Sequence, residues 1–112
     1  MKPGTDKLLI KAERAARVAR LGLDAGAPQA AAGRAFYALL YAAKAILNER
    51  GLRPHAHVRI AAALPREHGH LREQLSDAIA RRRDGEEMEY GEAEDLVERA
   101  RTCVGDVRRH IR

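Results

Sequence analysis

A chain of 112 residues is long enough for a single domain with one hydrophobic core. Its apolar residues are mostly alanine (22) and leucine (12), with only 4% aromatic residues and no tryptophan, which favours helices and excludes a protein built on β-sheets. The net charge is +5, concentrated in residues 1–60 with 11 Lys/Arg against 4 Asp/Glu, and the single cysteine excludes an intramolecular disulfide framework.

The first predicted helix covers about residues 5–21, where apolar residues recur every three or four positions. Thr5 and Asp6 are the expected N-cap, and residues 22–27 are the expected loop because two of the six are glycine. The arginines of this helix could face a polyanion such as RNA. A solvated face of an amphipathic helix is the simpler interpretation.

The second predicted helix runs from Pro28, a first-turn proline, to Arg50, and Gly51 is a suitable residue after its C-cap. It is apolar around most of its circumference, which predicts a central position among the other helices. One polar stripe interrupts the apolar surface, formed by Arg34, Tyr37, Tyr41, Lys44 and Asn48. This stripe is a solvent edge, a dimer seam or a functional site.

The rest of the chain predicts a short helix over 57–64, a turn at 68–70, and longer helices over 70–83 and 91–111. Cys103 borders the apolar stripe of the last helix and is expected to be a small core residue. Four long helices with one short extra helix predict an all-α, up-and-down four-helix bundle that forms one domain over residues 1–112. Residues 84–98 hold eight acids and no base, a pattern typical of a solvated connection or of a place where a basic partner docks.

Residues 33–47, GRAFYALLYAAKAIL, resemble the second-helix signature of HEPN domains. That signature has an arginine between small residues, then two aromatics, then alanines and large apolar residues. Gly51, Leu52 and His57 match the glycine, leucine and histidine that follow it in the family. More loosely, residues 81–100 resemble the arginine segment and terminal helix of the family.

The resemblance implies a four-helix bundle that usually dimerises and is often paired with a minimal nucleotidyltransferase in toxin–antitoxin or stress-response modules. Some relatives are metal-independent ribonucleases with an arginine, four to six residues, and a histidine near the start of the last long helix. Here that spacing occurs only after the second helix, from Arg50 to His55 and to His57. The expected function is therefore a homodimeric HEPN binding module that partners a nucleotidyltransferase, rather than an enzyme.

Two other functions remain open. A metal-independent ribonuclease would use His57 as the base and Arg34 as the cation that holds the phosphorane charge. A non-catalytic nucleotide or RNA binder would use the basic first half of the chain. The candidates for contact with RNA, nucleotide or partner are Tyr37, Tyr41, Lys44, Arg53 and His55. The purely structural interpretation packs the tyrosines at a helix or dimer seam and pairs Arg34 with an acid of the last two helices.

The histidine pairs His55/His57 and His68/His70 could hold zinc, but exposed loop histidines are the simpler interpretation, and no metal or cofactor is expected. A Walker-type phosphate loop and a Gly-x-Ser-x-Gly elbow are both absent from the sequence, which excludes ordinary kinase and hydrolase classes. No apolar run approaches the about 18 residues of a membrane span, and no secretory signal is visible. We therefore expect a cytoplasmic protein without membrane contact.

Overall fold

The computed structural model describes residues 1–111, and this part of the chain is all-helical, without a strand. The all-α class predicted from the composition is confirmed. The elements are α1 (Thr5–Asp24), α2 (Pro28–Glu49), α3 (His57–Ala63), the 3-10 turn η1 (Arg66–His68), α4 (Gly69–Arg83) and α5 (Tyr90–Ile111).

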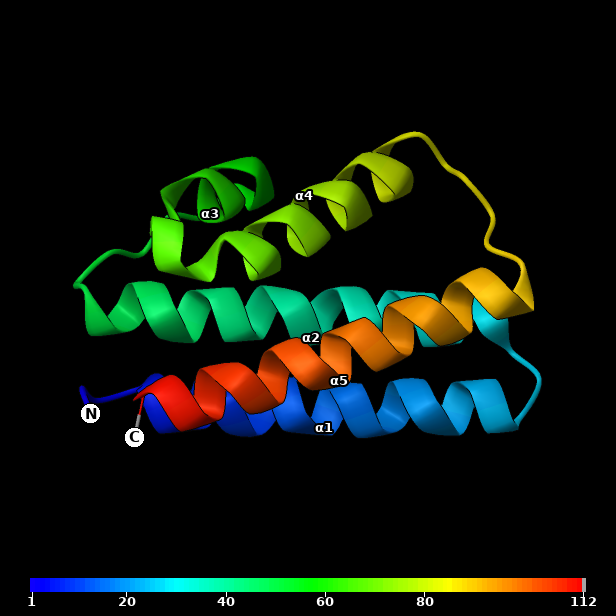
Figure 1. Cartoon of the computed structure of the whole chain (residues 1–112), viewed down its shortest axis with the longest axis horizontal. Coiled ribbons are helices and arrows are strands. Elements are labelled where there is room, and N and C mark those ends of the chain that lie inside the picture. The colour runs from blue at the N-terminus through cyan, green and yellow to red at the C-terminus, as the bar shows by residue number, and fades with distance from the viewer. Residues whose placement is uncertain (112) are drawn as a thin grey trace.

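Helix α2 is the centre of the fold and contacts each of the other α-helices (Figure 1). Helices α1 and α5 pack on one side of it, while α3 and α4 lie on the other (Figure 1). This arrangement buries twelve residues of α2, among them the fully buried Phe36. The central position predicted from its apolar circumference is confirmed. The N-terminus and the last turn of α5 lie at the C-terminal end of α2 (Figure 1).

The boundaries of α2 follow the sequence signals. Pro28 occupies the first turn, where its missing N–H costs no hydrogen bond. Gly51 has a φ of +74°, the left-handed conformation that glycine adopts without strain, and the Leu52 amide donates to the Leu47 carbonyl oxygen at 2.9 Å. The conformation of Gly51 and this hydrogen bond end the helix as predicted.

The two ends of α1 differ from the prediction. Thr5 is not the N-cap, because that position belongs to Gly4 with a φ of +90°, and neither Thr5 nor Asp6 caps the helix through its side chain. The helix also continues to Asp24, so that Gly22 is helical and the loop shrinks to residues 25–27. The glycine at 22 serves close packing against Ala31 rather than a turn.

The predicted turn at residues 68–70 is also wrong. Gly69 has helical angles, φ −58° and ψ −35°, and α4 begins there directly after η1. Cys103 is buried as expected, and its burial raises the pKa of the thiol to about 11. It is a core residue and not a nucleophile.

Among the described residues, α2 alone is long and apolar enough to span a membrane by length and mean hydropathy. Of the window that meets those measures, 67% is buried inside the fold. A core helix of a folded domain satisfies the same two measures.

Candidate nucleic-acid interface

Cations and aromatic rings lie against one another beside α2. Tyr37 and Tyr41 are one helical turn apart, and their ring centroids lie 6.0 Å from each other. The Phe36 ring meets Tyr37 edge-on at 5.2 Å. Neighbouring helices add three further side chains. We call the whole set the cation–aromatic row: Lys11, Arg34, Phe36, Tyr37, Tyr41, His57 and Arg82.

Each cation of the row lies over an aromatic ring. The guanidinium carbon of Arg34 is 5.0 Å from the centroid of Tyr37, and Lys11 Nζ is 5.7 Å from that of Tyr41. Arg82 lies 4.5 Å from the Phe36 centroid and 5.5 Å from that of Tyr37. Such contacts are electrostatically favourable because the ring face carries partial negative charge. The tyrosine rings are half-buried, while the cations themselves are exposed.

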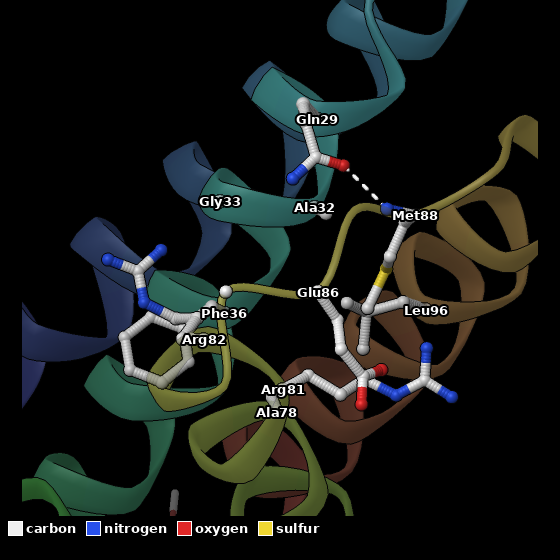
Figure 2. Close-up of a pocket in the computed structure, with 11 residues that line it drawn as sticks. Gln29, Ala32, Gly33, Phe36, Ala78, Arg81, Arg82, Glu86, Met88 and Leu96 are labelled. Carbon is white, nitrogen blue, oxygen red and sulfur yellow. Dashed lines mark hydrogen bonds between the residues drawn. The ribbon is translucent and has the colours of Figure 1, made fainter.

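The three arginines at the end of α4 have different partners. Arg81 contacts Glu92 at 3.1 Å and Asp77 at 3.4 Å, and the Glu92 carboxylate raises the pKa of Arg81. Arg83 lies 3.7 Å from Asp84. Arg82 instead covers the Phe36 ring, as Figure 2 shows. Of this group, Arg82 is the arginine that belongs to the row.

The positive charge of the row is not neutralised by acids. Within residues 1–111, Lys11, Arg34 and Arg82 form no ion pair. The expected ion pair between Arg34 and an acid of the last two helices is therefore wrong for the described chain. Charges without a partner in the fold are available to an anionic ligand.

A hollow of about 300 Å³ adjoins the row between α2 and α4 (Figure 2). Its apolar lining includes Phe36, Ala32 and Leu96, and Arg81, Arg82 and Glu86 supply its charges. On one side, Gln29 Oε1 accepts a hydrogen bond of 2.6 Å from the Met88 amide, which ties the segment after α4 to the start of α2. The hollow offers an apolar surface beside the free guanidinium of Arg82.

The two residues predicted for catalysis are not brought into contact. His57, the first residue of α3, packs against Phe36 with ring centroids 5.4 Å apart, while Arg34 covers Tyr37. Each of the two side chains therefore lies against a different aromatic ring. His57 is exposed, and within residues 1–111 no hydrogen bond orients it as a base.

The remaining predicted residues form a separate group. Lys44, Arg53 and His55 line a hollow of about 170 Å³ near the C-terminal end of α2, together with apolar residues that include Leu8 and Leu52. Arg53 and His55 are exposed and Lys44 is half-buried. The seven predicted site residues thus fall into two groups, four in the cation–aromatic row and three in this hollow.

No protein-family model matches this chain, and no curated protein matches it either.

Proposed function

We propose that this chain is a cytoplasmic, non-catalytic RNA-binding module with a HEPN-like four-helix bundle, and that single-stranded RNA binds along the cation–aromatic row. One observation carries the proposal: three exposed cations without acidic partners lie over aromatic rings on a single side of α2. Cations hold phosphates, and tyrosine faces stack on unpaired bases.

The long cationic side chains and the aromatic rings of the row match the two chemical groups of single-stranded RNA, its phosphates and its unpaired bases. Lysine and arginine are long, so the three cations can swing from the rings to phosphate oxygens while the half-buried rings of Tyr37 and Tyr41 stay fixed by α2. Each tyrosine face that a cation leaves becomes a platform for a base. Single-stranded RNA supplies both groups at once, whereas duplex RNA keeps its bases stacked inside the helix.

Anisotropy of a short, labelled single-stranded RNA tests the proposal. We expect the double variant Arg34→Ala/Arg82→Ala to bind about tenfold more weakly, which corresponds to about 1.4 kcal/mol. Arg99→Ala is the matched control, because Arg99 is an exposed arginine of α5 outside the row. Equal affinity of the double variant and the wild type would contradict the proposal, as would equal weakening by the control.

The ribonuclease alternative is tested on the same RNA in excess EDTA. Cleavage requires a base and a cation at one phosphate, and the contacts of His57 and Arg34 with different rings favour binding without turnover. We expect the RNA to stay intact. Cleavage that disappears in both His57→Ala and Arg34→Ala would establish the enzyme instead.

A second candidate function is contact with a partner protein, and the outer face of α1 favours it. Three large apolar residues are exposed there: Ile10 by 37%, Val18 by 47% and Leu21 by 64%. Arg14 and Arg17 lie on the same helix and are also exposed, which favours an acidic partner surface. The HEPN resemblance implies that this partner is a minimal nucleotidyltransferase.

Titration of the protein with a purified minimal nucleotidyltransferase, with the affinity of the complex as the readout, tests whether α1 binds this partner. Leu21→Glu should abolish a complex that uses α1, because it places a charge in the apolar contact. Ala30→Glu, at an exposed position of α2, is the control that should leave the complex intact.

A further inference from the structure

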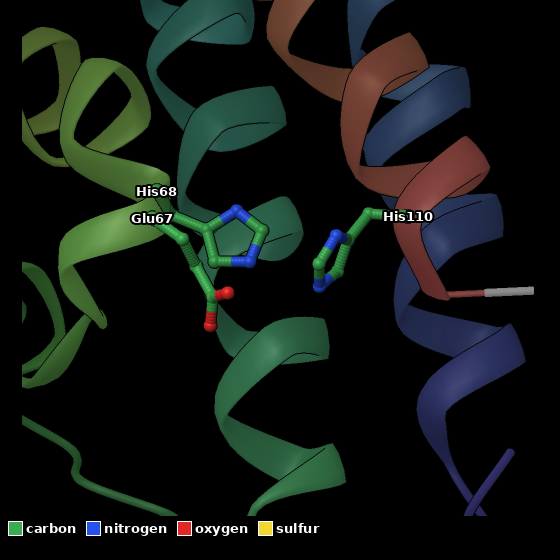
Figure 3. A group of neighbouring side chains, drawn as sticks. All are labelled: Glu67, His68 and His110. Atoms are coloured by element: carbon green, nitrogen blue, oxygen red, sulfur yellow. The ribbon is translucent and has the colours of Figure 1, made fainter.

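Two histidines and a glutamate from distant parts of the chain meet beside the end of α2. Glu67 and His68 belong to η1, and His110 belongs to the last turn of α5 (Figure 3). One potential ligand atom from each lies within 4.8 Å of the other two. The imidazole rings of His68 and His110 are nearly perpendicular, with centroids 4.5 Å apart.

The imidazole of His68 has an unused nitrogen. Its Nε2 is buried and has no hydrogen-bond partner among the residues that the structure describes. Buried polar atoms are nearly always paired, so an unpaired nitrogen needs a ligand or a water molecule to explain it. The same histidine borders a hollow of about 280 Å³, lined by Ile46, Glu49, Arg50 and Ile111 as well as His110. There is room for an ion and its water at this place.

We propose that Glu67, His68 and His110 bind one zinc ion, with water in the fourth position. Two imidazoles and a carboxylate suit zinc better than Mg²⁺ or Ca²⁺, which prefer oxygen ligands. Tetrahedral ligands at about 2.1 Å from the metal lie about 3.4 Å apart, so the three atoms must approach one another on binding. Glu67 and His110 are exposed, so this movement requires a change of side-chain rotamer at His110 and release of the Glu67 carboxylate from Arg50.

Arg50 is the charged group that competes with the metal. Its Nη2 donates to Glu67 Oε1 at 2.6 Å, which holds the carboxylate in place but puts a positive charge next to the site. Glu49 also borders the hollow, but its Oε2 already accepts hydrogen bonds from the Thr5 hydroxyl and the Lys2 amide. Removal of the Arg50 charge should therefore strengthen zinc binding.

The ion would join two parts of the fold that otherwise meet there only through the edge-on contact of the His68 and His110 rings. Within the described residues, α5 and η1 share no backbone contact, and α4 meets α5 only sparingly. A bound metal would connect the C-terminal turn of α5 to the start of α4. Zinc should therefore raise the thermal midpoint of the protein.

Calorimetric titration of the metal-free full-length protein with zinc chloride tests the site. We expect one ion per chain, with His110→Ala binding at least about 100-fold more weakly and showing no rise in thermal midpoint. His110 is exposed, and unchanged helical circular dichroism confirms that this variant folds. His70→Ala is the matched control, since His70 is an exposed histidine two residues from His68.

Three further variants complete the test. His68→Ala and Glu67→Gln should weaken binding, and Arg50→Gln should tighten it. Cobalt in place of zinc should give the strong visible absorption of a tetrahedral site. The proposal is overturned if zinc binding does not saturate, or if His110→Ala binds zinc as tightly as the wild type. It is also overturned if neither Glu67→Gln nor Arg50→Gln changes the affinity for zinc.

Discussion

Thr5, Asn48 and Glu49 form a hydrogen-bond network that holds the N-terminus against the end of α2. Asn48 Nδ2 donates to Thr5 Oγ1 at 2.9 Å and to the Pro3 carbonyl oxygen at 3.0 Å. The Thr5 hydroxyl in turn donates to Glu49 Oε2 at 2.6 Å. Thr5 and Asn48 are the buried polar residues of the core, and their side chains satisfy each other.

Replacement of Thr5 by valine should destabilise the protein by about 1–3 kcal/mol, because Asn48 loses a buried acceptor. Thr102→Val is the matched control at an exposed position of α5 and should change the free energy of unfolding by less than about 0.5 kcal/mol. Urea denaturation measures both. Equal effects of the two substitutions would show that the network contributes nothing.

The same network makes stability depend on pH. The hydrogen bond from Thr5, and after it the bond from the Lys2 amide, lower the pKa of Glu49 from 4.5. The ionised carboxylate is thus favoured in the folded state, so its contribution is complete above pH 4.5 and is lost as pH falls through the lowered pKa. Thermal unfolding between pH 3 and pH 7 should show a shallower loss of stability on acidification in Glu49→Gln than in the wild type.

These residues also show that local sequence patterns do not predict contacts between residues that are far apart in the chain. Thr5 followed by Asp6 is a common start of a helix, and the pattern is informative only about neighbours in the chain. The actual partners of Thr5 are 43 and 44 residues away. Glu67 stands beside His68 in the sequence, but His110 joins them only through the packing of α5, which the spacing of histidines does not reveal.

At the scale of elements, α1 and α2 approach closely where their connection is short. A Cβ atom at Gly22 would lie 3.2 Å from the Cα, Cβ and nitrogen of Ala31. Ala31 is fully buried, and two of these three atoms are backbone, so the neighbouring helix has little freedom to move away. Glycine at position 22 therefore allows the contact between the two helices.

Gly22→Ala should lower the free energy of unfolding by about 1–3 kcal/mol through overpacking, although alanine is the better helix former. Gly105→Ala, in the interior of α5, is the control: its added Cβ meets only Arg109 at an ordinary 3.6 Å and should stabilise the helix by up to about 1 kcal/mol. Stabilisation by both substitutions would contradict the close contact.

Local sequence patterns predict most of the helices, but they do not predict which helices pack together. Apolar periodicity, Pro28 and Gly51 locate α2 within a residue because each signal acts inside one helix. The sequence predicts Gly22 and Gly69 as turn residues, yet both are helical, because tertiary packing decides the conformation of a glycine near a helix end. Arg82 reaches Phe36 through the register of α4 on α2, which no local pattern encodes.

For the whole molecule, a homodimer that forms through α2 would compete with RNA for one surface. Most of α2 is covered by helices of its own chain, and Tyr37, Tyr41 and Lys44 are among its half-buried residues, so a second copy that packs on α2 would contact this strip. A dimer along this strip would cover the cations that RNA needs.

Light scattering at micromolar concentration tests this competition. We expect a dimer mass for the free protein and a shift toward one chain per complex as single-stranded RNA is added. A monomer mass without RNA would refute the homodimer. A dimer mass that persists with RNA bound would place the dimer interface away from the tyrosines.

RNA binding at the proposed site requires that the cation–aromatic row holds phosphates. The most direct measurement is the salt dependence of RNA affinity for the wild type and for Arg34→Gln/Arg82→Gln, which removes two charges while keeping polar side chains. Each phosphate contact to a single strand contributes about 0.7 to the slope of log affinity against log salt concentration. We predict that the double variant has a slope shallower by about 1.4, and an unchanged slope would contradict the account.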